Sequence, residues 1–252
     1  AFFKKYGIQD SARIILRVAR IGPHYYESVL DGMRMAESLH QRGLDVCFVH
    51  IGYADVPSLA DEVYAFAKTV NDRAGKVIAV SASDESQVAL KYFAMASVVV
   101  GTGRSAFEGM SLGKPTMIVG KLGFAGPVDP DHLPAQAQYN YSGRNADGSQ
   151  TKEAYQAEYD ETMYRVLSDP HYAAQLGQYA FDHVLNTLDV SISVPIYEAR
   201  YRAYRTEWMS TPSELRRASM YSWIKRGLRN MMSKSFRAQV SSMINLRQKK
   251  AA

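Results

Sequence analysis

The residues best suited to chemistry in this chain follow an apolar run at 97–100. They are, in chain order, Gly101, Thr102, Gly103, Arg104 and Ser105. Glycines let a backbone approach a ligand closely, and the N–H groups that open a helix attract anions. Arg104 would add positive charge, and Ser105 could cap the helix or hold a phosphate oxygen. The stretch therefore predicts a phosphate-binding turn, although a tight reversal of the chain would need the same glycines.

Glu108 lies one helical turn beyond these residues. A carboxylate there repels phosphate, but it accepts hydrogen bonds from two hydroxyl groups, such as those of a ribose. We therefore expect a nucleoside diphosphate, with its phosphates at the glycines and its ribose at Glu108. Residues 101–106 also match the dinucleotide pattern G-x-G-x-x-A. That pattern needs an acidic residue about 20 positions on, where Lys121 stands, so a nicotinamide or flavin cofactor is disfavoured.

These residues need a scaffold, and the first 120 residues alternate predicted strands and helices. Runs of Val and Ile without polar alternation predict strands that are covered on both faces, as in a parallel sheet. We expect strands at 12–20, 45–53, 76–82, 97–101 and 116–120, and helices at 25–43, 58–75, 83–96 and 105–112. The fold class is therefore α/β, a doubly wound Rossmann-like parallel sheet. Ligands of such sheets lie beyond the carboxyl ends of the strands.

The rest of the chain has a different pattern. Residues 121–150 are rich in Gly, Pro, Asp and Asn and predict a long loop. Residues 151–208 have a helical pattern that is broken near 168–172 and near 193–195. We expect one domain at 1–209, the sheet with its trailing helices, followed by a basic amphipathic helical tail at 210–252.

Composition narrows the class of protein. The chain has 252 residues, of which 46% are hydrophobic, and its single cysteine is Cys47. A disulfide framework is therefore excluded, and a cytoplasmic location is expected. The six histidines are scattered and form no ligand set, so we expect no metal site. No apolar run is long enough to span a bilayer.

Positive charge is concentrated in the tail. Of the 30 Lys and Arg residues ten lie at 213–252, with Glu214 as the one acid, which leaves 20 basic against 24 acidic residues over 1–212. Apolar residues at helical spacing among these charges predict a helix that lies on an anionic membrane surface. Docking of the same apolar stripe on the rest of the protein is the alternative. Nucleic acid is disfavoured as a partner because the body of the chain is acidic.

Several motifs occur together in the order seen in a known family. They are "ILRVARIG", "VCFVHIG", "VVVGTGRSAFEGMSLGKPTMIVG", "GFAGPVDPD" and "LSDPHYAAQLGQYAFDHV". Over residues 12–205 the chain resembles the carboxy-terminal half of retaining GT-B glycosyltransferases of the family 4 type. The best motif, "FEGMSLGKP", is similar to the family's Glu-Ala-Met-Ala-x-Gly-x-Pro. The resemblance implies that residues 1–209 form a nucleotide-sugar donor-binding domain.

The resemblance also implies roles for single residues. Arg20 matches an arginine that holds the donor diphosphate, and Ser81 lies where the nucleotide base is usually held. Residues 101–105 match the turn whose backbone amides meet the phosphates or the sugar. Glu108 matches the glutamate that binds the ribose hydroxyls. No catalytic residue and no cofactor is implied, because the nucleotide diphosphate sugar is the substrate.

Two positions depart from the family pattern. Tyr25 stands where the family usually has a lysine, and Val100 stands where it often has a second glutamate. A non-catalytic nucleotide-sugar-binding or scaffold subunit therefore stays open as an alternative, as does a sugar-nucleotide epimerase.

The main expectation is a glycosyltransferase of the hexosyltransferase type. It would transfer a sugar to a saccharide or lipid-linked acceptor in cell-surface polysaccharide synthesis. The acceptor-binding amino-terminal half is not in this sequence, so a missing domain or partner subunit is expected. The basic tail would place the protein peripherally on the inner face of the membrane.

Overall fold

The computed structural model describes residues 1–146, 151–210, 217 and 220. Contacts divide the chain into two compact units, Ala1–Asp189 and Val190–Ala252. The last described helix therefore groups with the residues that follow it, whereas the sequence placed the boundary at 209/210. The tail predicted at 210–252, and with it the expected membrane surface, lies almost entirely outside the described residues. No helix in the described part of the chain is both long and apolar enough to cross a membrane.

Six strands form one sheet in the order β3-β2-β1-β4-β5-β6. The strands are β1 (Arg13–Val18), β2 (Val46–Ile51), β3 (Ala79–Ser81), β4 (Val98–Gly101), β5 (Thr116–Gly120) and β6 (Gly123–Pro127). β1 to β5 pair in parallel, and β6 is antiparallel to β5. The chain runs outward from β1 to β3 and then returns to continue on the other side with β4. This confirms the doubly wound α/β prediction, with all five expected strands present.

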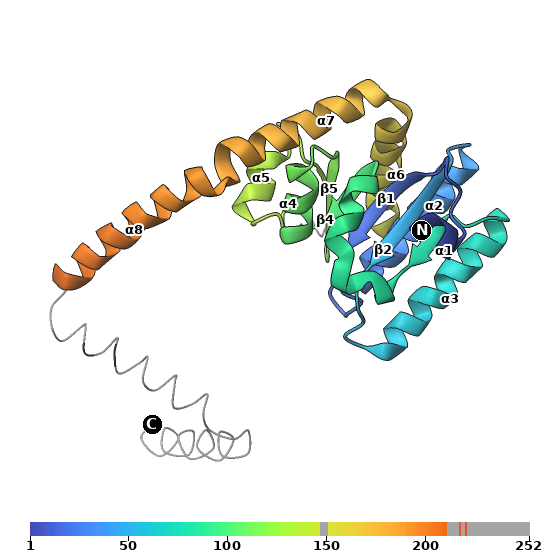
Figure 1. Ribbon diagram of the computed structural model, residues 1–252, viewed down its shortest axis with the longest axis horizontal. Helices are drawn as coiled ribbons and strands as arrows, with labels where there is room; N and C mark the ends of the chain where they lie inside the picture. The colour runs from blue at the N-terminus through green and yellow to red at the C-terminus, as the bar shows by residue number, and fades with distance from the viewer. Residues whose placement is uncertain (147–150, 211–216, 218–219, 221–252) are drawn as a thin grey trace, which may run out of the picture. The chain divides into compact units, whose positions relative to one another are not determined.

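Helices cover both faces of this sheet (Figure 1). On one face α2 (Tyr26–Gln41), α3 (Pro57–Ala74) and α6 (Lys152–Ser168) pack in a core that includes Ile15 and Phe48. On the other face α1 (Phe2–Tyr6) and the 3₁₀-helical segment η1 (Ser83–Met95) pack against Leu16 and Val49. Successive strand residues point to opposite faces, so both sets are buried. This double burial explains why the strands are mostly apolar, without alternation of apolar and polar residues.

A third cluster joins β5 to two further helices. Met110 of α4 (Arg104–Ser111), Ile118 of β5 and Ala180 of α7 (Pro170–His183) are buried together. The cluster fixes α4 directly after β4, which is the place predicted for the phosphate-binding turn.

The expectation of a loop throughout 121–150 is wrong, because this region contains β6 and the helix α5 (Leu133–Gln138). Gln136 is fully buried, and its side-chain amide donates to the carbonyls of Ala125 and Pro127 at 3.0 Å each and to that of Gly126 at 3.2 Å. Hydrogen bonds from a distant side chain thus support a strand whose own residues have a poor strand propensity.

The start of one helix also differs from the sequence expectation. The helix expected from Ser58, which the sequence suggested as its N-cap residue, begins instead at Pro57 after Val56, without a side-chain capping bond. Proline suits the first turn of a helix because the N–H group that it lacks would have no partner there.

The break predicted near 168–172 is confirmed at Asp169. The second break falls after the π-helical turn η2 (Val184–Leu188), and α8 (Val190–Ser210) then runs through Pro195. The expected break near 193–195 is therefore absent.

Candidate functional site

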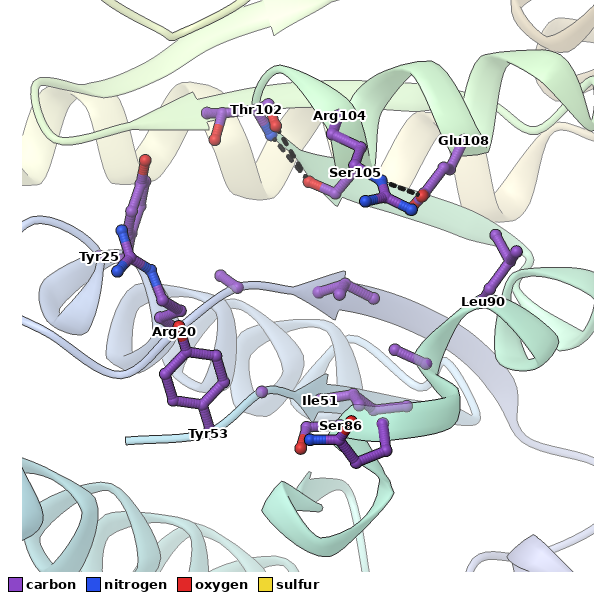
Figure 2. A pocket seen from close by; sticks show the side chains of 15 residues that line it. Arg20, Tyr25, Ile51, Tyr53, Ser86, Leu90, Thr102, Arg104, Ser105 and Glu108 are labelled. Atoms are coloured by element: carbon purple, nitrogen blue, oxygen red, sulfur yellow. Dashed lines mark hydrogen bonds and ion pairs between the residues drawn. The ribbon is translucent and has the colours of Figure 1, made fainter. Parts of the chain in front are cut away.

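The carboxyl ends of β1, β2 and β4 meet at a pocket of about 570 Å³. Its walls come from the β1–α2 turn, the residues after β2, η1 and the start of α4 (Figure 2). Of the residues predicted from the sequence, the pocket brings together Arg20, Thr102, Arg104, Ser105 and Glu108. Parallel strands place their carboxyl ends on one edge of the sheet, which is why residues more than 80 positions apart converge here.

Arg20 follows β1 and reaches the pocket with half of its side chain exposed. Its Nη1 lies 3.3 Å from Oδ2 of Asp55. Tyr53, through its hydroxyl, and then the charge of Asp55 raise the pKa of Arg20 above its ordinary value. In Figure 2 Arg20 and Tyr25 lie at one end of the pocket, away from Glu108. Arg20 is therefore a stable cation that an anionic ligand can contact.

The turn into α4 is built on two glycines. A Cβ on Gly101 would lie 2.7 Å from Oγ of Ser105 and 2.9 Å from the backbone nitrogen of Ala106, so the strand end and the helix start are in close contact. Gly103 has φ 51° and ψ −119°, a backbone conformation that residues with a Cβ rarely adopt. Neither glycine lines the pocket itself. Their role in the structure is to shape the turn.

Two amides of this turn already have acceptors within the protein. The Gly103 N–H donates to the Tyr141 carbonyl at 2.8 Å, and the Thr102 N–H donates to Oγ of Ser105 at 3.2 Å. The sequence expectation assigned these amides to phosphate. The N–H groups of Arg104, Ser105 and Ala106 open α4, where no intrahelical acceptor exists for them. They are the better donors for an anion at this site.

A strained loop holds the turn in place. Asn140 and Tyr141 have φ values of 52° and 53°, a backbone conformation that residues other than glycine seldom adopt. The Tyr141 hydroxyl lies 2.5 Å from Nε2 of His183 in α7, and the Tyr141 carbonyl accepts from Gly103. The segment around Tyr141 therefore links α7 to the start of α4.

Glu108 lies at the far end of the pocket from Arg20 (Figure 2). Its Oε1 accepts from Nε of Arg104 at 2.8 Å. The Glu108 side chain is 20% exposed and that of Arg104 is 88% exposed. Because Arg104 lies largely in solvent, this ion pair is weak and opens easily. The carboxylate is therefore accessible to ligand hydroxyl groups.

Ser81 does not line the pocket. It lies beside His50, whose Nδ1 is 2.9 Å from Oγ of Ser81 and whose Nε2 is 2.8 Å from the Ala19 carbonyl. His50 is fully buried in β2, so it joins the carboxyl ends of β1, β2 and β3. The structure thus gives Ser81 a supporting contact at the site, and its assignment to the base stays a prediction.

Acid should destabilise the fold through His50. Burial first, and the charge of Arg17 as well, lower the pKa of His50 to about 4, from 6.5 for the free side chain. Between these values the unfolded chain binds a proton that the folded chain excludes, so stability is full above about pH 6.5 and falls as the pH drops toward 4. The expected loss is about 3 kcal/mol in the free energy of unfolding.

Urea unfolding at neutral pH and at about pH 4 measures this loss. His50→Gln is the control, because its neutral amide can donate and accept but does not titrate. A pH dependence that is the same in both proteins would contradict the assignment to His50.

Several lining residues were not singled out from the sequence. Gly52 and Tyr53 follow β2, and Ser86, Gln87 and Leu90 come from η1. Gly52 and Tyr53 could have been identified as lining residues from the sequence, because they lie at the carboxyl end of a predicted strand. In the part of the chain that the structure describes, no group of three His, Cys, Asp or Glu residues could hold a metal ion.

No protein-family model matches the sequence, and no curated protein matches it. Solved structures do match. One is the C-terminal domain of the glycosyl transferase group 1 family protein LpcC from Francisella tularensis. The match spans 75% of this chain and 91% of that domain, with a TM-score of 0.52 and 15% identity. Another is the α,α-trehalose-phosphate synthase (UDP-forming) from Burkholderia vietnamiensis. The match spans 83% of this chain and 50% of the synthase chain, with a TM-score of 0.54 and 14% identity.

TarM from S. aureus, in complex with Fondaparinux, α-GlcNAc-glycerol and UDP, covers 71% of this chain and 33% of its own, with a TM-score of 0.48 and 15% identity. The chain thus spans a third of TarM, half of the trehalose-phosphate synthase and nearly all of the separately solved C-terminal domain. The chain has the fold of the carboxy-terminal half of a GT-B glycosyltransferase, as the motifs predicted.

Proposed function

We propose that this chain binds a nucleoside diphosphate sugar and serves as the donor half of a glycosyltransferase. One observation carries the proposal: a single pocket contains an exposed arginine at one end, the opening turn of α4, and an accessible carboxylate at the other end. A diphosphate suits Arg20 and the N–H groups of α4, and a ribose suits Glu108. The diphosphate and the ribose are neighbouring groups in a nucleoside diphosphate sugar, and the residues suited to each line the same pocket.

The chemical task is to stabilise the diphosphate as it leaves the sugar. Negative charge develops on the leaving oxygen, and cations and helix N–H groups that are already in place lower the free energy of that transition state. Arg20 and the start of α4 can supply this stabilisation. We propose transfer of a hexosyl group with retention to a saccharide or lipid-linked acceptor in cell-surface polysaccharide synthesis. The acceptor would be bound by a second domain or a partner subunit.

The proposed setting is the cytoplasmic face of the membrane. The basic segment at 213–252, which lies almost entirely outside the described residues, would attract the chain to anionic lipids and hence to a lipid-linked acceptor.

Calorimetric titration of the chain with UDP, GDP and ADP tests donor binding. We expect saturable binding of at least one of them, and we expect Arg20→Ala to weaken it about tenfold by removing a charged contact to phosphate. Arg73→Ala is the matched control, because Arg73 is an exposed arginine paired with Glu37 and does not line the pocket. Failure of all three nucleotides to bind would contradict the proposal.

A non-catalytic nucleotide-sugar-binding subunit is the second candidate, and two residues favour it. Tyr25 lines the pocket where a lysine would add a further cation to Arg20 and Arg104, and Val100 is fully buried within β4. Glu108 is therefore the one carboxylate among the described lining residues. Release of nucleoside diphosphate from a nucleotide sugar, assayed with and without a separately supplied partner domain, distinguishes the two. Binding without release under both conditions supports the second candidate.

A further inference from the structure

A buried arginine lies in the middle of the sheet. Arg17 of β1 pairs with His50 of β2 on one side and with Val100 of β4 on the other, and it is 1% exposed. Charged groups are costly in the interior unless they are paired and fully hydrogen-bonded. A strand position in the centre of a doubly covered sheet is normally apolar. The presence of a guanidinium there needs an explanation.

The hydrogen bonds of Arg17 are incomplete. Its Nη2 donates to Oγ of Ser28 at 2.6 Å and to the Val119 carbonyl at 3.1 Å. Its Nε and Nη1 are buried without a partner. Burial lowers its pKa below the ordinary value for arginine, and Tyr159 first, then Tyr25 and Asp31, oppose this shift. Arginine nevertheless stays protonated in proteins, so Arg17 is a buried cation with unused donors.

No carboxylate in the described residues forms an ion pair with Arg17. Asp31 is also buried, but it already pairs with Arg34 and lies 3.5 Å from Nζ of Lys152. At the pocket itself the charges cancel in pairs, Arg20 with Asp55 and Arg104 with Glu108. The two exposed arginines of the pocket each have a carboxylate partner, whereas the buried Arg17 has no ion-pair partner in the described part of the chain.

Arg17 is linked to the pocket through the start of α2. Ser28, which accepts from Arg17, donates its own hydroxyl to the Tyr25 carbonyl at 2.7 Å. Tyr25 caps α2 and lines the pocket, as do the residues that follow Arg17 in the chain, Val18 and Ala19. The positive end of the α2 dipole also lies at this turn. The dipole and the charge of Arg17 therefore both favour an anion there.

We propose that Arg17 is a positioning residue of the diphosphate site, supplying positive charge from beneath the β1–α2 turn and fixing that turn through Ser28. This inference rests on the proposed donor-binding function. It offers a source for the charge that Tyr25, standing where the resemblance expects a lysine, does not provide. Bound diphosphate would in turn compensate the buried guanidinium.

The test compares binding of the diphosphate and the monophosphate of one nucleoside, UDP with UMP, GDP with GMP and ADP with AMP. Arg17→Met removes the charge at similar volume and leaves Asp31 paired. We expect this variant to bind the diphosphate about tenfold more weakly, a change of about 1.4 kcal/mol. Binding of the monophosphate should fall less. The free variant should melt no lower than the wild type, because removing a poorly paired buried charge is often neutral or stabilising.

Arg17→Lys keeps the charge and should keep the preference for diphosphate over monophosphate. Arg73→Met is the surface control and should bind as the wild type does.

If Arg17→Met does not fold, the Arg17→Lys variant decides. Loss of its preference for diphosphate over monophosphate overturns the inference, and a retained preference supports it. Unchanged diphosphate binding by Arg17→Met also overturns it, as do equal losses for both nucleotides with a lower melting temperature. No binding by the wild type overturns the proposed function together with this inference.

Discussion

Glu108→Ala should lower the affinity of the chain for a nucleoside diphosphate by roughly 10- to 100-fold. A carboxylate that accepts from ribose hydroxyl groups makes charge-assisted hydrogen bonds, and each is worth about 1.5 to 3 kcal/mol. The Glu108 side chain is accessible and its intramolecular partner Arg104 is largely exposed, so little else in the fold depends on it. Calorimetric titration of both proteins measures the change.

The ribose assignment can be isolated by changing the ligand as well. The wild type should bind the 2′,3′-dideoxy nucleotide more weakly than the parent nucleotide, whereas Glu108→Ala should bind the two equally, because the two changes remove the same interaction. Glu161→Ala is the matched control: Glu161 is an exposed glutamate that pairs with Arg42. A dideoxy penalty that persists in Glu108→Ala would show that another group holds the ribose.

Gly52→Ala should destabilise the fold by about 3 kcal/mol or more. A Cβ at this position would lie 1.7 Å from the Ala19 carbonyl oxygen and 2.6 Å from its carbon, which are backbone atoms that cannot rotate away. The segments after β1 and β2 are held together here, because the Ala19 N–H donates to the Ile51 carbonyl and the Ile21 N–H donates to the Tyr53 carbonyl. The added methyl group would force them apart and widen the pocket that Ala19 and Gly52 line.

Thermal unfolding should show the effect of Gly52→Ala as a fall of roughly 6 to 12 °C in melting temperature. Gly22→Ala is the control at the same edge of the sheet. Its Cβ would meet the side chain of Asp55, with Oδ2 at 3.0 Å, and that side chain can move. The control should therefore lose much less stability. A melting temperature for Gly52→Ala close to that of the wild type would mean that the two strand ends separate at little cost.

The strands and the main helices could be predicted because their sequence patterns reflect local burial. Phe48 and Val49 lie on opposite faces of β2 and are both fully buried, so the apolar run was informative. β6 could not be predicted, because its residues are mostly glycine, alanine and proline and its support comes from β5 and Gln136. α8 runs through Pro195, where the sequence indicated a break.

The candidate site shows the same division. Glycine spacing identified the turn at 101–105, and strand order explains why Arg20 converges on it. The partner of the Gly103 amide could not be predicted, because Tyr141 lies in a loop far along the chain. Arg17 was overlooked because it lies within a strand and not after one. Tertiary contacts, which leave no local pattern, decide both cases.

The outer strands of the sheet also affect how the protein can meet other chains. At one edge β3 has only three residues, and at the other β6 ends at Pro127 and pairs with an irregular register. Short or proline-containing edge strands present few free backbone N–H and C=O groups in a row. They therefore disfavour pairing with an edge strand of another molecule. We therefore expect self-aggregation through strand addition to be disfavoured in this protein.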